Sequence, residues 1–228
     1  AARIVRAFEA NRWIRLKNYI ELKYGFKPAG KHLRILDELI RFNSPVRKAW
    51  ERSNYILDKM NIQPGDHIAD VGAGAGFFSF LFADKVGPSG RVIALDLNTQ
   101  HLAYIDQAAK TERLSQIEVT TTDGTEVGAA GNSLDFVFLC AAYQAVYAFE
   151  REDSRTALLN NIKTALKTDG KLVIVDNTLD VPEGTKPYHG ILISQKAATA
   201  QLEAHGFKLL DASYAVPQRY VLVFEKAD

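Results

Sequence analysis

Residues 70–77 read Asp-Val-Gly-Ala-Gly-Ala-Gly-Phe and connect a short apolar run to a helical pattern. A glycine-rich turn from a strand into a helix lets a ligand approach the backbone closely, and it offers the N–H groups of the first helical turn to the ligand's polar atoms. Three glycines and two alanines within five positions, directly after Asp70-Val71, exceed what an ordinary tight turn requires. The segment therefore predicts a site for a nucleotide-like ligand.

Short apolar runs and helical patterns alternate along the chain after residue 66, which is typical of a mostly parallel sheet covered on both faces. We expect strands at 67–71, 91–97, 117–121, 134–141, 171–176, 207–216 and 220–226. We expect helices at 77–85, 99–111, 154–166 and 190–205, the third followed by a turn at 168–170. Only three residues separate the last two strands, which makes them an antiparallel hairpin. The fold class is therefore α/β, a Rossmann-like, doubly wound, seven-stranded and mostly parallel sheet with a C-terminal antiparallel hairpin.

The spacing of the glycines separates two classes of ligand. The dinucleotide fingerprint G-x-G-x-x-G would place its third glycine at Phe77, whereas the sequence has Gly76 one position earlier. This mismatch argues against NAD. An acidic residue followed by x-G-x-G-x-G at the end of the first strand instead resembles the first motif of the class I S-adenosylmethionine-dependent methyltransferases, over roughly residues 55–228.

The resemblance implies methyl transfer with S-adenosylmethionine as cofactor. It assigns the cofactor to the loop residues Asp70, Gly72, Ala73, Gly74 and Gly76, with Asp70 organising the loop near the amino end of the cofactor's methionine part. An NAD-dependent oxidoreductase and a catalytically degenerate, methyltransferase-like binding protein remain as alternatives.

Two later motifs extend the expected cofactor site. Asp96 lies at the tip of the second strand, where a carboxylate can accept hydrogen bonds from both hydroxyls of a ribose. Because NAD enzymes use such an acid too, it does not discriminate between the cofactors. The resemblance places Leu97 against the adenine ring. It also implies that Asp123, beside Gly124, accepts a hydrogen bond from the adenine amino group, although an Asp-Gly pair is equally typical of an ordinary turn. Cys140, at the end of the fourth strand, completes the expected cofactor-binding set.

Catalytic candidates are expected after the fourth and fifth strands, at the carboxyl edge of the sheet. Methyl transfer from a sulfonium needs alignment and desolvation, and it needs a base only if the acceptor must lose a proton. Tyr143 could orient an acceptor or could be a core aromatic residue. The resemblance leads us to expect a histidine beside it, where Gln144 stands instead. His189 could accept a proton at neutral pH or could be a surface residue.

The metal and compartment expectations follow from the histidines and the cysteine. The five histidines have no ligand spacing, and the single cysteine cannot form an internal disulfide. We therefore expect no metal site and a reducing, cytoplasmic location. No run reaches the roughly 20 apolar residues of a membrane helix.

The net charge of +1 conceals two unlike parts. Residues 1–52 hold 13 Lys and Arg against 5 Asp and Glu, whereas residues 53–228 hold 15 against 22. We expect a helical N-terminal extension or lid at 1–54 and a methyltransferase domain at 55–228. The basic aromatic extension could pack on the domain or make a peripheral contact with an anionic membrane. We expect a small-molecule acceptor, which can be apolar, and not a nucleic acid, because the domain is acidic and lacks the Asn/Asp-Pro-Pro-aromatic motif of DNA-base methylators. The sequence does not indicate an oligomeric state.

Overall fold

The computed structural model describes residues 34–35, 37–39, 41–43, 47–149, 151–178 and 192–227, with the side chains of all of these except 148–149. Most of the expected N-terminal extension and the catalytic candidate His189 lie outside the described residues. The division at residues 54 and 55 stays a prediction.

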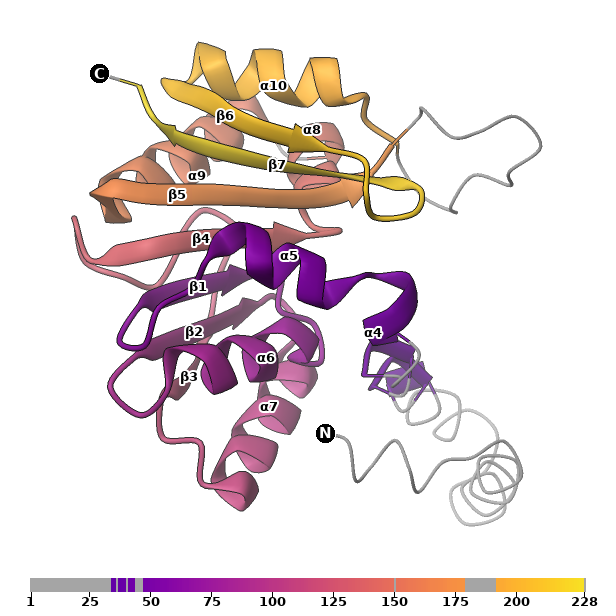
Figure 1. Cartoon of the computed structure of the whole chain (residues 1–228), viewed down its shortest axis with the longest axis vertical. Coiled ribbons are helices and arrows are strands. Elements are labelled where there is room, and N and C mark those ends of the chain that lie inside the picture. The colour runs from indigo at the N-terminus through magenta and orange to yellow at the C-terminus, as the bar shows by residue number, and fades with distance from the viewer. Residues whose placement is uncertain are drawn as a thin grey trace.

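Seven strands form one sheet in the order β3-β2-β1-β4-β5-β7-β6 (Figure 1). Their bounds are β1 (His67–Val71), β2 (Arg91–Asp96), β3 (Ile117–Thr121), β4 (Leu134–Cys140), β5 (Leu166–Asn177), β6 (Phe207–Ser213) and β7 (Arg219–Lys226). β1 is parallel to its neighbours β2 and β4, β3 is parallel to β2, and β5 is parallel to β4. β7 runs antiparallel to both β5 and β6. The expected parallel sheet with a C-terminal hairpin is confirmed.

Helices cover both faces of this sheet (Figure 1). Their bounds are α4 (Arg47–Trp50), α5 (Ser53–Met60), α6 (Phe77–Val86), α7 (Thr99–Glu112), α8 (Tyr143–Phe149), α9 (Glu152–Ala165) and α10 (Gln195–Ala204). Ile162 of α9 and Leu202 of α10 are buried in the core on one face. Ile56 of α5 and Phe82 of α6 are buried on the other face. Strands buried on both faces must be apolar throughout, which explains their continuous apolar runs.

The apolar periodicity of residues 46–60 predicts one helix, whereas the structure has two in this stretch. Arg52 has a left-handed backbone, with φ of 46°, and separates α4 from α5. A residue in this conformation cannot continue an α-helix. The interruption places Glu51, the last residue before Arg52, in a fully buried position.

The turn expected at 168–170 is also wrong, since these residues belong to β5. Leu134 pairs with Leu166 and Phe136 with Lys171, so four residues of β5 stand opposite one residue of β4 in an irregular, bulged stretch. α8 has no counterpart among the expected helices. Near the start of α8, the Gln144 N–H donates to Asp176 Oδ2 of β5 at 2.8 Å. Because this carboxylate is 32 positions away in the sequence, no local sequence pattern marks the beginning of the helix.

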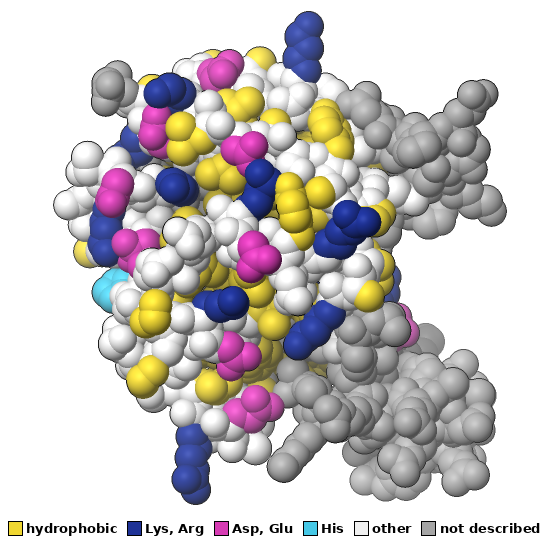
Figure 2. All heavy atoms as spheres, in the orientation of Figure 1, with side chains coloured by type: hydrophobic (Ala, Val, Ile, Leu, Met, Phe, Trp, Pro, Cys, Tyr) yellow, Lys and Arg dark blue, Asp and Glu magenta, His cyan; other side chains and the backbone are white. Residues whose placement is uncertain are grey.

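Within the described ranges, no helix combines the length and the apolar character needed to cross a bilayer. On the face drawn in Figure 2, the described Lys and Arg side chains are interspersed with Asp and Glu. Such mixing differs from the clustered basic surface that is typical of nucleic-acid binding.

Candidate active site

The glycine loop is fixed to the end of β2 by its backbone. The N–H groups of Gly72 and Ala73 both donate to the Leu95 carbonyl, at 2.8 and 2.9 Å. Gly72 has a φ of +76°, and a Cβ at this position would lie 2.7 Å from the Ala142 Cβ after β4. The loop therefore needs glycine here for its backbone conformation and for its close approach to the next loop.

Asp96, at the end of β2, makes two hydrogen bonds to the backbone. Its Oδ2 accepts from the Gly74 N–H and its Oδ1 from the Asn98 N–H, both at 2.7 Å. Partial burial would raise the pKa of Asp96, but His101 and these N–H groups together hold it below its ordinary value. Each carboxylate oxygen has a further lone pair, so Asp96 can still accept hydrogen bonds from a ligand.

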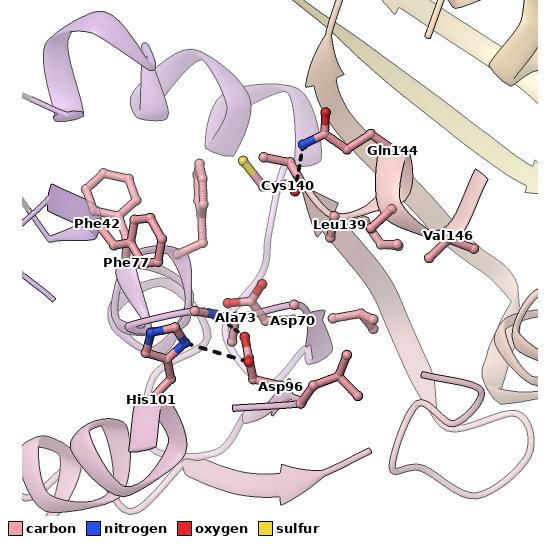
Figure 3. Close-up of a pocket in the computed structure, with 18 of the residues that line it drawn as sticks. Phe42, Asp70, Ala73, Phe77, Asp96, His101, Leu139, Cys140, Gln144 and Val146 are labelled. Atoms are coloured by element: carbon pink, nitrogen blue, oxygen red, sulfur yellow. Dashed lines mark hydrogen bonds and ion pairs between the residues drawn. The ribbon is translucent and has the colours of Figure 1, made fainter. Parts of the chain in front are cut away.

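Asp70, the acid before the loop, is only 2% exposed. Burial raises its pKa to about 7, although a 2.6 Å hydrogen bond from Ser79 Oγ to its Oδ2 acts in the opposite direction. The side chain therefore changes charge close to neutral pH, at a position between the two ends of the site (Figure 3).

A cavity of about 570 Å³ lies over the carboxyl edge of the sheet. Figure 3 shows Asp96 and His101 at one end and Gln144 and Val146 at the other. Eight of the expected cofactor-binding residues line it, namely Asp70, Gly72, Ala73, Gly74, Asp96, Leu97, Gly124 and Cys140. Its size is within the range of roughly 300–1,000 Å³ that is usual for small-molecule sites.

Two residues expected at the cofactor do not line the cavity. A Cβ on Gly76 would meet Ile105 at 2.8 Å and Phe80 at 2.9 Å, so this glycine allows α6 and α7 to pack closely. The Asp123 Oδ1 accepts from the N–H and the Oγ1 of Thr125, at 2.9 and 2.7 Å, and these bonds lower its pKa. Its exposed carboxylate is occupied in a local turn, the alternative that the Asp-Gly pattern left open.

Tyr143 is a core residue, and an orienting role in the site is not supported. Its side chain is 0% exposed, and its hydroxyl donates to Gln201 of α10. Burial raises the pKa of this phenol, and the ring does not line the cavity. His189 stays a prediction, because it lies outside the described residues.

Sequence reasoning missed a charged cluster where α4 meets the sheet. Glu51 Oε2 accepts from Arg47 Nε at 2.6 Å, and its Oε1 accepts from Arg219 Nη1 of β7. The Cys140 thiol lies beside them, with Sγ 3.4 Å from Glu51 Oε1 and 3.2 Å from Arg219 Nη1. Burial raises the pKa of Cys140, which makes it a poor nucleophile. Because the pair Glu51 and Arg219 is separated by 168 positions, no local pattern marks it.

His101 of α7 was also missed. Its Nε2 lies 3.1 Å from Glu38 Oε2, and its Nδ1 lies 3.7 Å from Asp96 Oδ1. Burial opposes a charge on this ring, but the two carboxylates outweigh it and raise the pKa of His101. Asn43 Nδ2 also donates to the Ala75 carbonyl at 2.8 Å. The described N-terminal residues thus contact both the glycine loop and a neighbour of Asp96.

Among the described residues, no group of three or more His, Cys, Asp or Glu side chains is arranged so that it could hold a metal ion.

Residues 68–170 match the family model of the methyltransferase domain. A demethylmenaquinone methyltransferase from Oceanobacillus iheyensis is 26% identical over 131 residues, which are 58% of this chain and 52% of that protein. The corresponding enzyme from Lactobacillus johnsonii is 25% identical over 154 residues, 67% of this chain and 59% of its own length. The chain thus spans between half and two thirds of these relatives.

Among solved structures, a SAM-dependent methyltransferase from Aquifex aeolicus superposes with a TM-score of 0.72 and 19% identity, covering 84% of this chain and 98% of that one. This likeness supports the fold, and the family match lies on the segment that carries the glycine loop and Asp96. These findings agree with the family expected from the motifs: residues 68–170 match a methyltransferase domain, and the fold is that of a SAM-dependent methyltransferase structure.

Proposed function

We propose that the protein transfers the methyl group of S-adenosylmethionine to a small aromatic acceptor. The observation that carries this proposal is that Asp96 and the glycine loop line the same cavity as a set of apolar and arginine side chains. A group-transfer enzyme must hold its two reactants in one shared space that excludes water.

Three parts of the cavity suit the cofactor. Asp96 would accept the ribose hydroxyls with its remaining lone pairs, in bonds that a carboxylate makes strong. The exposed side chain of Leu97 would cover the adenine ring, since it lines the cavity although it is 67% exposed. Asp70 would face the amino group of the methionine part, where a positive charge favours the ionised carboxylate.

The bound cofactor supplies an electrophilic methyl group, and this chain supplies alignment and a dry surface. Leu139 and Val146 line the cavity away from Asp96 (Figure 3), where they would keep water from the reacting atoms. Well-aligned reactants can recover on the order of 7–11 kcal/mol of barrier, so methyl transfer does not require a nucleophilic side chain.

An aromatic acceptor is favoured by aromatic side chains that line the cavity and by the relatives. Trp50 and Phe77 line the cavity and offer flat apolar surfaces. The two reported relatives are named for demethylmenaquinone, whose ring system is flat and apolar. We therefore propose a quinol-type acceptor. A peripheral membrane contact through the basic N-terminal extension would suit such an apolar substrate and stays a prediction.

Two measurements test this function. S-adenosylhomocysteine at a hundred times its Kd should increase the free energy of unfolding by about 2.7 kcal/mol and so raise the melting temperature. NADH should not raise it. Radiolabelled S-adenosylmethionine should then transfer its methyl group to a short-chain demethylmenaquinol. Stabilisation by NADH alone would favour an oxidoreductase. Cofactor binding without transfer to this quinol or to any fraction of a cell extract would favour a degenerate binding protein.

A further inference from the structure

The charged cluster turns its two cationic members toward the cavity. Arg219 is 4% exposed and Arg47 is largely buried, and both line the cavity. Glu51, which binds both guanidinium groups, is 0% exposed and does not line it. A ligand in this part of the cavity therefore meets the guanidinium groups of Arg47 and Arg219, and the Glu51 carboxylate lies behind them.

Both guanidinium groups are held in place. A buried charge without a partner is strongly destabilising, so the shared carboxylate of Glu51 fixes where Arg47 and Arg219 can lie. Aromatic rings add to this, because the Arg219 Cζ lies 5.4 Å from the Trp50 ring centroid and the Arg47 Cζ lies 4.3 Å from that of Phe77. A guanidinium held in this way is preorganised to bind an oxyanion.

The two arginines differ in their neighbours. Arg47 lies over Phe77, the first residue of α6, and its charge acts on Asp70 beside the glycine loop. The Cys140 thiol does not distinguish the two arginines, because its Sγ lies 3.2 Å from Arg219 Nη1 and 3.8 Å from Arg47 Nη2. Arg219 lies over Trp50, and its charge acts on Asp176 at the end of β5. Arg219 is therefore the arginine on the acceptor side of the cavity.

Asp176, the carboxylate on which the charge of Arg219 acts, has hydrogen-bond partners of its own. Asp176 accepts hydrogen bonds from the N–H groups of Gln144 and Asn177, both at 2.8 Å. Burial raises the pKa of Asp176 to about 6, and it does not line the cavity. It therefore does not place a carboxylate where a ligand would meet Arg219.

We propose that Arg219, positioned by Glu51, selects a methyl acceptor whose reactive ring carries an ionised hydroxyl oxygen. This inference rests on the proposed function and names the acceptor's charge. The hydroxyl loses its proton to solvent on binding, so the transfer step needs no base. A bond then forms between the methyl carbon and either this oxygen or the adjacent ring carbon that shares its charge. The carbon–sulfur bond breaks and its electron pair stays on sulfur, so the phenolate and sulfonium charges cancel. Transfer to carbon gives the keto tautomer, which loses its ring proton to solvent and gains one on oxygen to restore the aromatic ring.

The first test reads ionisation directly and does not depend on turnover. The probe is 4-nitrophenol, whose phenolate and phenol differ in absorbance, titrated with protein saturated with S-adenosylhomocysteine. An opposite charge within hydrogen-bonding range should lower the apparent pKa of the bound probe by about one unit or more. Arg219→Gln should abolish this shift, and Arg219→Lys should keep part of it. The control is Arg91→Gln, which removes a guanidinium from an exposed pair with Glu118.

A second arm separates the acceptor from the cofactor, which also carries a carboxylate. The affinity for S-adenosylhomocysteine should be the same in Arg219→Gln as in the wild type, while labelled transfer to the demethylmenaquinol falls at neutral pH and recovers at higher pH. A loss of S-adenosylhomocysteine affinity would assign Arg219 to the cofactor and overturn the proposal. So would an unshifted 4-nitrophenol pKa in the wild-type protein, a result that needs no variant to fold. Failure of the wild type to bind S-adenosylhomocysteine would instead overturn the proposed function itself.

Discussion

The Asp96 carboxylate accepts a 2.7 Å hydrogen bond from the backbone N–H of Gly74, so the ends of β1 and β2 are joined through a loop and a side chain. The same carboxylate also accepts from the Asn98 N–H at the start of α7. One residue therefore shapes the glycine loop and presents its remaining lone pairs to the cavity. Loss of Asp96 should disturb both the loop and the ligand.

Asp96→Ala should weaken S-adenosylhomocysteine binding by about 1.5–3 kcal/mol, the usual contribution of hydrogen bonds to a charged group. Isothermal titration calorimetry measures this directly. Asp123→Ala is the matched control, because its carboxylate binds Thr125 and does not line the cavity. The control should bind like the wild type. Equal losses in the two variants would return Asp123 to the adenine site.

Gly72→Ala should destabilise the fold by about 1–3 kcal/mol, because it combines a strained backbone with a steric clash. The added Cβ would lie 2.7 Å from the Ala142 Cβ. Gly87→Ala is the matched control, since Gly87 also has a positive φ but has no neighbour within 4 Å of the added atom. Urea unfolding of both variants should show the larger loss for Gly72→Ala. Equal losses would mean that backbone strain alone matters at this loop.

The residues of the glycine loop and Asp96 could be predicted to share one cavity because their chemistry is local. Asp70, the glycines and Asp96 lie at strand ends, where the sequence pattern fixes the strand and the residue type fixes the chemistry. Asp123 was ambiguous for the same local reason, since a carboxylate before glycine also forms a turn with its own neighbours. Sequence alone could not choose between these two arrangements.

The charged cluster of Glu51, Arg47 and Arg219 was not predictable, because Arg219 reaches the other two residues only through the fold. Glu51 reads as part of a continuous helical pattern, and Arg219 reads as part of a hairpin. Their pairing depends on the left-handed backbone at Arg52 and on the place of β7 beside β5. The sequence left Tyr143 open between an acceptor-orienting role and a core position, because the carboxylate at the start of α8, the helix that turns its ring into the core, comes from a distant strand.

Tyr143→Phe should lower stability by about 1 kcal/mol, the usual loss when a buried hydrogen bond is removed, without changing the kinetics of methyl transfer. Its hydroxyl is bound to Gln201 and lies outside the cavity. A double-mutant cycle with Gln201→Ala, measured by urea unfolding, should show the coupling of the two side chains. A tenfold fall in kcat/KM with unchanged stability would restore the catalytic role expected from the sequence.

Asp70 should make the protein less stable as the pH rises from about 4 to about 7. Its pKa is raised from the usual 3.8 to about 7 by burial, so the folded state binds more protons than the unfolded state within this range. The stability that protonated Asp70 contributes is therefore fully present below pH 4 and lost by pH 7, with a slope of at most about 1.4 kcal/mol per pH unit. Asp70→Asn removes this titration while it keeps an oxygen that can accept from Ser79.

Urea unfolding of wild type and Asp70→Asn at several pH values across this window isolates the effect. The raised pKa of Asp176, about 6, acts in the same direction but is common to both proteins. The stability of the variant relative to the wild type should therefore increase with pH up to about 7 and then level off. A difference that stays constant from pH 4 to 7 would show that Asp70 is ionised throughout. Asp70 would then already carry, in the free protein, the negative charge that we propose faces the amino group of the cofactor.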